Sequence, residues 1–551
     1  MKLRIPLMSL AFCAAVSAKP AHGYVLRAPD GTPAAVCGTM LLRTDPSRSR
    51  PAARVTLPGS YVSPARWFRI HYTTASGSAD AVPAADANQN GVPDWVELAA
   101  SVADSVYANY RALGYTTPLT DGGASGGTEY DIFFINLAPQ NVYGYTFSPP
   151  DGYMGLDNDY AERIYQTKGA TGLRITLAHE LFHSVQFAVW VGGNDGIWWQ
   201  EATATFMEEY NYPDINDYWQ YLDPDWFCNT LFENPAAPLN QGSTGSCDTH
   251  MYGAAVFCQY LVRTDSVSGH AGIRYSFDRQ KVLRSSAPNV VVDALETTMQ
   301  QPMRELIAGF WSRAYFTGPR SPRTPFFPDG AAWTSPPPSA LLSADWEIKR
   351  LGSSGSTQFP VKAAGLGGGI VRIVPDRTAG GVRLTTDATT NWAWRVAVSA
   401  GDSVRIIVPR ENRVSVSNWD QVEDIVVTFG NGAVTPTESQ IMLTAAYDPE
   451  LTRPAPEEFL LTLEQNRPNP FNPGTEFDFS LSEPAGVTIR VYSVLGIPVR
   501  TLVSNAAYGS GLHTGSWDGL DDRGTQVPSG VYILQVTALG RTRSRKMVIV
   551  R

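Results

Sequence analysis

The hydrophobic pattern of this chain changes near residue 345, and that change limits the possible folds more than any other feature. Before it, apolar residues recur at helical spacing in several long segments, with a few strands among them. After it, short alternating segments are separated by Gly, Asp and Asn, a pattern typical of antiparallel sheets. With 551 residues, the chain is also too long for a single core. We therefore predict a multidomain protein, with an α+β domain followed by two all-β sandwich domains.

Composition shifts along the chain place the boundaries of these domains. We assign residues 66–345 to the α+β domain and residues 346–447 to the first sandwich. Residues 448–462 are rich in Pro and Glu and read as a linker, and residues 463–551 form a second, Ig-like sandwich. Residues 19–65 are rich in Pro, Ala and Arg and weakly patterned, as in a pro-segment or N-terminal extension.

The first 18 residues indicate export. Lys2 and Arg4 precede a short apolar stretch, and the small residues at 16–18 suit cleavage, so residues 1–18 read as a signal peptide rather than an ordinary N-terminal helix. No other stretch is long and apolar enough for a transmembrane anchor. The net charge of −9 comes from scattered residues, and the absence of a Lys/Arg block argues against nucleic acid as a partner.

The segment "AHELFH" carries the clearest chemical signal. His179 and His183 stand at positions i and i+4 of a predicted helix, so both imidazoles can face one metal ion, with Glu180 beside them. Zinc bound there lowers the pKa of a water molecule, and a neighbouring carboxylate then serves as general base and later as general acid. The alternative is a buried helix whose two histidines are satisfied by hydrogen bonds in the core.

A third ligand in the following helical segment distinguishes these interpretations. The sequence after His183 lacks the third histidine of a metzincin, whereas "WWQEATATFMEE" supplies Glu201. Glu208 and Glu209 are fallback ligands that we expect on the solvated face of the same helix. The sequence therefore predicts a zinc site formed by His179, His183 and Glu201.

These motifs resemble those of gluzincin-type zinc metallopeptidases. The likeness lies in H-E-L-F-H-x-x-Q and W-x-Q-E-A-x-A-x-x-M-E, and in the segments "FRIHYTT", "NGVPDWVE" and "YGAAVF", which are similar to those of secreted bacterial metallopeptidases. It implies a zincin-like catalytic domain, with zinc held by His179, His183 and Glu201 and Glu180 as the catalytic carboxylate. Gluzincins also place a Tyr or His opposite the zinc to hold the developing oxyanion. Tyr252 is our preferred candidate and His250 the second, with simple packing as the alternative for either.

By analogy with zincins, the strand "YMGLDNDY" is expected at the rim of the cleft, where it could bind an extended peptide as an added strand.

The segment "DANQNGVPDWVE" predicts a calcium loop. It fits the pattern D-x-[DN]-x-[DN]-G-x5-E. A loop stabilised by Asx turns without metal is the alternative. The expected calcium ligands are Asp86, Asn88, Asn90, Val92 through its carbonyl, Asp94 and Glu97.

Four cysteines remain after the signal peptide. Cys228 and Cys247 flank a Gly/Ser-rich loop and are the most natural disulfide pair. Cys258 lies in an apolar helical pattern, as a buried thiol would. Cys37, followed by glycine, resembles the cysteine switch of some metallopeptidase zymogens; a disulfide with Cys258 and a structural thiol are the alternatives.

The C-terminal residues 463–551 resemble the sorting domain that directs cargo through the bacterial type IX secretion system. The likeness lies in N-P-F-N-P, V-Y-S-V-L-G and P-S-G-V-Y, and the same fold family includes Ig-like modules of flagellar hook-capping proteins. It implies the outer-membrane secretion machinery as a partner and a secreted or cell-surface location, reached through the periplasm of a Gram-negative-type bacterium.

Together these features predict an exported zinc-dependent metalloendopeptidase that acts on extracellular proteins or peptides. Its cofactors would be Zn²⁺ and, at the loop, Ca²⁺. A surface or adhesion protein that keeps a zincin-like scaffold without catalysis is the competing interpretation.

Overall fold

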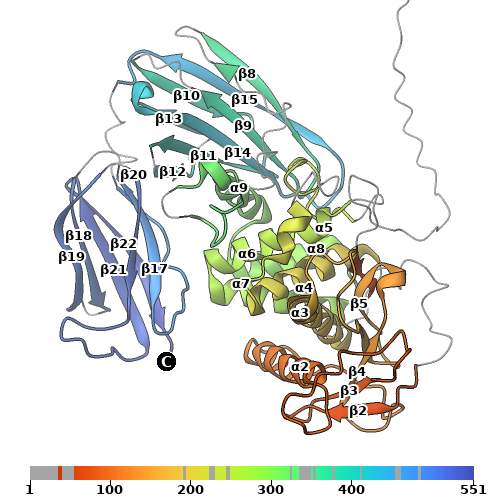
Figure 1. Ribbon diagram of the computed structural model, residues 1–551. Coiled ribbons are helices and arrows are strands. Elements are labelled where there is room, and N and C mark those ends of the chain that lie inside the picture. Colours follow the sequence, from red (N-terminus) through yellow and green to blue (C-terminus); the bar gives the residue numbers. More distant parts are fainter. Residues whose placement is uncertain are drawn as a thin grey trace, which may run out of the picture.

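The computed structural model has three parts: a helical region built on a mixed sheet, a middle β-sandwich and a C-terminal pair of sheets (Figure 1). The chain is therefore multidomain, with all-β parts at its C-terminal end. The structure describes residues 35–39, 55–189, 194–222, 230–242, 248–322, 325–333, 349–350, 355–374, 379–401, 403–409, 412–452, 461–481, 485–494, 496–509 and 511–551. The predicted signal peptide and the predicted disulfide partners Cys228 and Cys247 lie outside these residues.

The first part contains a six-stranded sheet in the order β1-β5-β6-β4-β3-β2. Strands β3, β4 and β6 are parallel to one another, whereas β5 runs antiparallel to β6 and β2 antiparallel to β3. The short strand β1 pairs with the outer edge of β5 in the parallel direction. The strands are β1 Val36–Cys37, β2 Gly59–Val62, β3 Phe68–Tyr72, β4 Tyr130–Ile135, β5 Val142–Thr146 and β6 Tyr153–Asp157.

Two features of this sheet differ from the sequence-based predictions. The sheet includes β1 and β2, which the sequence assigned to the N-terminal extension. The expected rim strand "YMGLDNDY" corresponds to β6, which lies inside the sheet between β5 and β4. That prediction was wrong, because both edges of β6 are already paired and cannot receive a peptide. The edge strand on that side is β1, with β5 between it and β6.

Helices cover the sheet and continue beyond it. Helix α2 has Asp94 and Glu97 in its first turn, where they complement the helix dipole, and it is followed by Gly114 at φ +82°. Helix α3 is buried from Ile175 to Phe187, as expected for a helix enclosed by the core on all sides. The helices are α2 Asp94–Ala112, α3 Gly169–Val189, α4 Ile197–Asn211, α5 His250–Gly253, α6 Ala255–Thr264, α7 Ser266–Leu283, α8 Pro288–Met299 and α9 Met303–Ala314.

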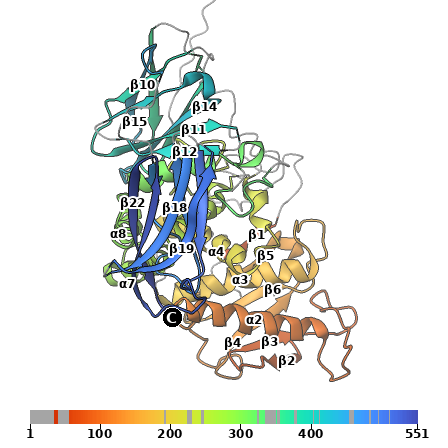
Figure 2. The ribbon, with the colours of Figure 1, turned by 90° about the vertical axis from the view of Figure 1, so that its left-hand side faces the viewer.

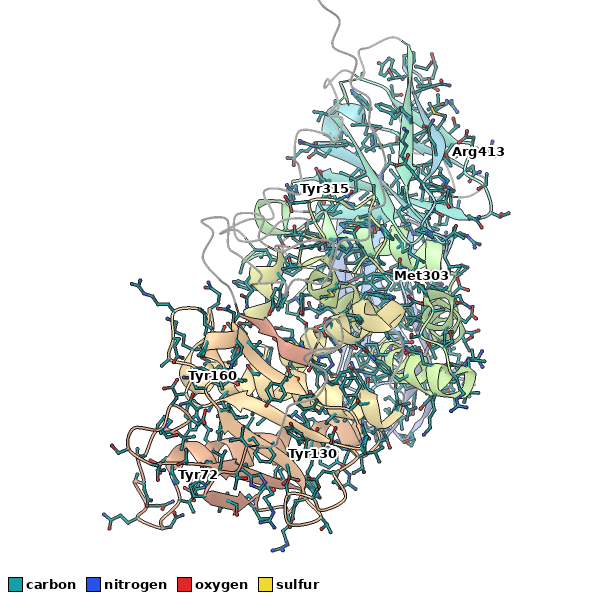
Figure 3. All side chains as sticks on the ribbon, turned by 90° about the vertical axis from the view of Figure 1, so that its right-hand side faces the viewer. Tyr72, Tyr130, Tyr160, Met303, Tyr315 and Arg413 are labelled. Atoms are coloured by element: carbon teal, nitrogen blue, oxygen red, sulfur yellow. The ribbon has the colours of Figure 1, made fainter. Side chains whose placement is uncertain are left out.

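The middle sandwich consists of two sheets in the orders β13-β10-β15-β8 and β12-β11-β14-β9-β7. Helix α9 packs directly on its second sheet: a Cβ added to Gly430 in β14 would lie 2.3 Å from the carbonyl oxygen of Arg304. Figure 3 shows Met303 and Tyr315, at the two ends of this helix, between the other helices and the sandwich. The strands are β7 Lys349–Arg350, β8 Ser356–Ala363, β9 Gly368–Val374, β10 Gly381–Thr386, β11 Trp392–Ala400, β12 Ser403–Ile407, β13 Arg413–Val416, β14 Asp424–Asn431 and β15 Ser439–Asp448.

The C-terminal part has a three-stranded sheet, β16-β17-β20, facing a four-stranded sheet, β19-β18-β21-β22. Its core is separate and contains Phe477, Phe479 and Trp517. In Figure 2 these strands lie below the middle sandwich and beside the helices. The strands are β16 Leu461–Leu463, β17 Thr475–Leu481, β18 Ala485–Ser493, β19 Pro498–Tyr508, β20 Gly511–Trp517, β21 Gly530–Ala538 and β22 Arg541–Ile549.

Candidate metal centre

Helix α3 presents the two histidines of the sequence motif side by side. The rings of His179 and His183 have centroids 4.7 Å apart, and their Nε2 atoms are 3.1 Å apart. The helix is held in place from α2, because the Tyr110 hydroxyl donates a hydrogen bond of 2.8 Å to the carbonyl of Ala178. The i, i+4 spacing therefore brings the two imidazoles to one point, as the sequence predicted.

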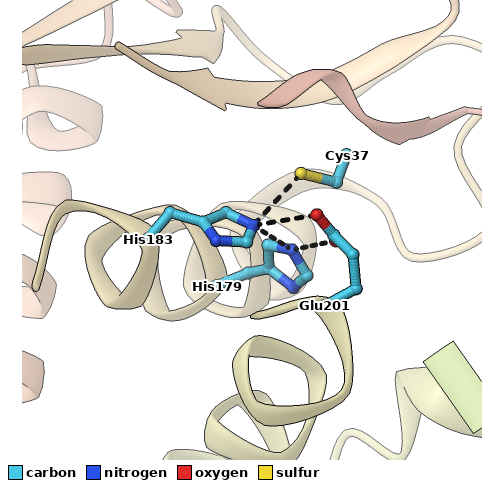
Figure 4. Close-up of side chains that lie close together, drawn as sticks. All are labelled: Cys37, His179, His183 and Glu201. Carbon is cyan, nitrogen blue, oxygen red and sulfur yellow. Dashed lines mark hydrogen bonds and ion pairs between the residues drawn. The ribbon is translucent and has the colours of Figure 1, made fainter. Parts of the chain in front are cut away.

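Glu201 reaches the same point from helix α4. Its Oε2 lies 3.2 Å from Nε2 of His179, and its Oε1 lies 3.4 Å from Nε2 of His183. Figure 4 shows these side chains and that of Cys37 converging from three segments of the chain. The ligand atoms of all four residues lie within 4.8 Å of one another. The structure thus brings together the three predicted zinc ligands.

The outer nitrogen of each imidazole is held by a second residue. Nδ1 of His179 lies 2.6 Å from Oε1 of Glu208, and Nδ1 of His183 lies 2.8 Å from Oε1 of Gln186. The orientation of the Gln186 amide follows from its nitrogen, which donates to the carbonyl of Gln200 at 3.0 Å. Both Nδ1 atoms therefore carry a proton, and the Nε2 atoms, which point at each other, are the ones available to a metal ion.

The expected exposure of Glu208 was wrong. The sequence placed it on the solvated face of α4, but its side chain is buried against His179. It follows Glu201 by two helical turns and so lies on the same face, a signal that the spacing already contained. Glu209 is partly buried, and burial together with Asp329 raises its pKa to about 8; it is not among the groups at the histidines.

The electrostatics of the cluster favour a bound cation. Burial lowers the pKa of both imidazoles, but Cys37, Glu201 and, at His179, Glu208 outweigh it. The pKa of His183 rises to about 10 and that of His179 rises well above its usual value. The positive charge of the imidazoles in turn holds the pKa of Glu201 below its usual range, although burial opposes this. Two nitrogens and a carboxylate converging in this way, each nitrogen with a fixed outer partner, are the donor set that zinc takes in catalytic sites.

Glu180 lies beside the cluster without belonging to the predicted ligands. Its Oε2 accepts hydrogen bonds of 2.8 Å from the hydroxyls of Thr146 and Thr39, and its Oε1 lies 3.2 Å from Sγ of Cys37. Strand β5 packs directly on this part of α3, because a Cβ added to Gly144 would lie 3.0 Å from Cγ of Glu180. No sequence pattern predicted Thr39 or Thr146, which reach Glu180 through tertiary contacts from the residues after β1 and from the end of β5.

Cys37 lies at the metal centre and is not bonded to Cys258. Both are free, buried thiols. Sγ of Cys37 is 3.4 Å from Nε2 of His183, whereas Cys258 lies in α6, where burial raises its pKa. The alternative of a disulfide between these two residues was therefore wrong.

The two candidate oxyanion donors have different surroundings. Burial raises the pKa of Tyr252 well above its usual value, and electrostatic interactions with Glu201, Cys37 and Glu180 raise it further. Residues of the metal centre therefore act on this phenol. Its hydroxyl is buried and has no hydrogen-bond partner among the described residues. Burial lowers the pKa of His250 to about 4, and its main charged neighbour is Asp248. Of the two, Tyr252 is the one whose pKa responds to residues of the metal centre.

The predicted calcium loop folds back on its own side chains. The carboxylate of Asp86 accepts from the backbone N–H groups of Asn90 and Gly91, at 3.1 and 2.9 Å. The amides of Asn88 and Asn90 donate to Glu97 at 2.9 and 2.7 Å. The structure thus brings Asp86, Asn88, Asn90 and Glu97 together, while the carboxylate of Asp94 accepts from the N–H of Ala87. The carbonyl of Val92 has no described contact here, and calcium binding stays a prediction.

No helix among the described residues is long and apolar enough to cross a membrane.

Part of this chain matches one protein-family model. Residues 466–541 match the model of the FlgD Ig-like domain, and no curated protein matches the chain. Among solved structures, PorZ of Porphyromonas gingivalis, described as an essential surface component of the type-IX secretion system, is 12% identical over 28% of this chain and 22% of its own, with a TM-score of 0.13. Latent PorU from the same organism is 11% identical over 38% of this chain and 19% of its own, with a TM-score of 0.17.

A third solved structure, β-glucuronidase 2 of Bacteroides uniformis, is 11% identical over 35% of this chain and 26% of its own, with a TM-score of 0.15. The matched parts span about a quarter or less of the three solved chains, and at these TM-scores no argument follows from them. The family match shows that residues 466–541 are similar to the FlgD Ig-like domain.

Proposed function

We propose that this protein is an exported zinc-dependent metalloendopeptidase that hydrolyses peptide bonds of extracellular proteins. The observation that carries the proposal is the convergence of His179, His183 and Glu201, with Nε2 atoms 3.1 Å apart and both outer Nδ1 atoms held by other side chains. Without a metal ion, the carboxylate of Glu201 favours protonated imidazoles, so a bound cation would displace a proton from this buried site. With zinc, each of the three residues contributes one ligand atom.

A zinc ion bound there would polarise the scissile carbonyl and lower the pKa of a water molecule. Glu180, whose carboxylate lies beside the ligands, takes the proton of the attacking water and passes it to the leaving amine. Glu208 and Gln186 keep the imidazoles in the tautomer that leaves Nε2 free. Tyr252 donates its hydroxyl proton as a hydrogen bond to the developing oxyanion.

The surrounding fold supports the same conclusion. A mixed sheet lies on one side of the motif helix, its antiparallel strand β5 packs on Glu180, and the next helix supplies the third ligand. This arrangement fits the zincin-like domain that the sequence resemblance implies.

The test separates the enzyme from a non-catalytic surface protein. The full chain should bind one zinc ion, measured by elemental analysis, and the secreted protein should cleave casein in a chelator-sensitive reaction. Glu180→Gln should keep the zinc and lower the cleavage rate by about 10²–10⁴-fold, the usual contribution of a general base. Absence of zinc from the folded protein, or equal cleavage by Glu180→Gln, would overturn the proposal.

We also propose that residues 463–551 direct the protein through a type IX secretion system to the cell surface or the medium. The support is the sequence resemblance of this segment together with the Ig-like family match. In a bacterium with this machinery, deletion of residues 463–551 should leave the protein in the periplasm, and fusion of the segment to a periplasmic reporter should export it. Retention of the reporter would contradict the assignment.

For the loop at residues 86–97 we propose a structural calcium ion. Millimolar calcium should raise the unfolding temperature of the wild type by mass action on the folded state. The shift should disappear in Asp86→Ala, and magnesium serves as the control cation. An equal shift in the variant would show that calcium acts elsewhere.

A further inference from the structure

Residues 35–39, a short piece of the N-terminal extension, lie inside the metal centre. Val36 pairs with Val142 and Cys37 with Gly144, so this piece forms the edge strand of the sheet next to β5. Ala35, Cys37 and Thr39 are 1%, 6% and 2% exposed. We call residues 35–39 the N-terminal latch.

Cys37 brings a fourth donor to the metal ligands. Its Sγ is 3.4 Å from Nε2 of His183 and belongs to the group whose ligand atoms lie within 4.8 Å of one another. Structural zinc sites have four protein ligands, whereas catalytic sites have three and leave one position open. With Cys37 in place, the site has the donor set of a closed one.

Thr39 is hydrogen-bonded to the carboxylate of Glu180 at the same time. Its hydroxyl accepts a hydrogen bond from the N–H of Thr146 and donates one to Oε2 of Glu180, both at 2.8 Å. Cys37 lies 3.2 Å from Oε1 of the same carboxylate. Oε2 of Glu180 is therefore hydrogen-bonded to the latch and Oε1 is covered by the Cys37 sulfur, so a water molecule would have to displace the latch to be activated there.

Gly38, between these two residues, permits the close approach. A Cβ at this position would lie 2.5 Å from Cγ1 of Val142 and 2.8 Å from the carbonyl oxygen of Gly144. Any side chain would push the latch away from β5. In the Cys-Gly-Thr sequence, the thiol of Cys37 lies beside the metal ligands, Gly38 allows the close approach to β5, and the hydroxyl of Thr39 is hydrogen-bonded to Glu180.

The latch also fills the space that a substrate needs. It covers the outer edge of β5, the strand that packs on Glu180. The cavity lined by Cys37, His179, Glu180 and Tyr221 has a volume of ≈ 20 Å³. That is room for about one water molecule and not for a peptide.

We propose that the N-terminal latch is an autoinhibitory strand, which holds the enzyme inactive by placing the Cys37 thiolate on the zinc and the Thr39 hydroxyl on Glu180. The inference rests on the proposed metallopeptidase function. Opening involves no redox change: the sulfur leaves the metal ligands and takes up a proton, and the edge of β5 becomes free for an extended peptide.

The experiment uses the full chain with cobalt in place of zinc. A thiolate bound to cobalt gives a charge-transfer absorption band, which should be present in the wild type and in Cys258→Ser, whose thiol is buried elsewhere. Cys37→Ser should lose the band while still binding one metal ion through His179, His183 and Glu201. Thr39→Val should keep the band, because it removes only the hydrogen bonds at Glu180 and Thr146.

Thiol labelling gives a second readout in the wild-type chain and does not depend on the folding of a variant. With zinc bound, Cys37 should resist a thiol reagent, and removal of zinc by a chelator should make it reactive. The labelled residue is identified by peptide mass analysis.

Activity completes the test. In the zinc-loaded full chain, Cys37→Ser and Gly38→Val should cleave casein at least about tenfold faster than the wild type, as expected if the latch is closed in more than about nine-tenths of molecules. A metal-loaded wild type without the cobalt band, or with Cys37 equally reactive before and after chelation, would overturn the latch and leave the proposed function intact. A folded chain that binds no metal would overturn the proposed function itself.

Discussion

At the scale of single residues, the metal centre depends on partners that carry no metal themselves. His179 and His183 are held at Nδ1 by Glu208 and Gln186, which set the tautomer and the ring orientation. The Glu208 contact, at 2.6 Å between two buried groups, is a charge-assisted hydrogen bond. Such outer partners raise the basicity of the ligand, so their loss should weaken the metal site without removing a ligand.

Glu208→Gln should therefore lower zinc affinity by about 10–100-fold, the usual effect of losing an outer partner. The measurement is the competition of the folded protein with a chromogenic chelator. Glu209→Gln is the matched control, since Glu209 is the neighbouring carboxylate and is not at the histidines. Equal affinities for the two variants would show that the contact with His179 does not support the metal.

Tyr252→Phe should lower kcat of the active enzyme by about 10²-fold or more with little change in KM, because the oxyanion forms only in the transition state. Tyr260→Phe is the control: this buried tyrosine of α6 packs on Phe310 with ring centroids 5.8 Å apart and does not line the cavity at the metal centre. Steady-state cleavage of a quenched fluorescent peptide gives both constants. A similar loss of kcat in both variants would argue against a specific role for Tyr252.

At the scale of secondary-structure elements, helices α4 and α7 show how burial controls a titratable group. His270 of α7 has its ring centroid 5.1 Å from that of Tyr210 and 5.9 Å from that of Phe206, both on α4. Burial lowers the pKa of His270 to about 4. The folded chain thus holds this imidazole neutral at neutral pH.

The stability of the folded chain should fall in mild acid for this reason. The pKa of His270 is about 6.5 in the unfolded chain and about 4 in the folded chain, so protonation favours unfolding. Its stabilising contribution is complete above about pH 6.5 and is lost as the pH falls towards about 4. His270→Phe keeps an aromatic ring between Phe206 and Tyr210 and removes the titration.

Urea unfolding at about pH 7 and about pH 5 measures the effect. The midpoint of the wild type should fall more between the two pH values than that of His270→Phe. Parallel decreases would assign the acid sensitivity to other groups.

At the scale of the whole molecule, the helical region and the middle sandwich share one packed interface. Helix α9 contacts β14 closely at Gly430, and the hydroxyl of Thr428 donates to the carbonyl of Ala308 at 3.0 Å. The C-terminal part meets the rest differently: a cavity of ≈ 380 Å³ lies between them, lined by charged side chains such as Arg313, Arg395, Arg467 and Asp478. A polar, loosely filled contact of this kind resembles a transient interface between domains.

Two truncated chains should show how differently the two interfaces contribute to the stability of the protein. A chain that ends at Thr452 should keep its zinc and an unfolding temperature close to that of the full chain. A chain that ends at Trp333 should be poorly soluble, because the apolar face of α9 would lose the sheet that covers it. The measurements are soluble yield, zinc content and thermal unfolding followed by tryptophan fluorescence. Equal behaviour of the two truncated chains would contradict this picture of the interfaces.

Much of this arrangement was accessible from local patterns in the sequence. The multidomain order, the all-β C-terminal end and the helix that carries His179 and His183 depend on hydrophobic periodicity and on residues four positions apart. These features depend on contacts within a helix or strand, and such contacts are encoded by neighbouring residues. Glu201 was expected from the motif in the next helical segment, but its place beside the histidines depends on the packing of α4 against α3.

The tertiary structure decided what lies around that motif. Glu208 is buried because α4 packs against α3, and β6 is internal because β5 and β1 pair beyond it. Cys37 meets His183 although 146 positions separate them in the chain, since an edge strand carries it there. Local periodicity does not specify which strand covers which sheet edge, because strand pairing depends on long-range hydrogen bonds and on the packing of the whole core. The sequence by itself therefore determined the metal-binding motif, and only the fold placed the N-terminal latch upon it.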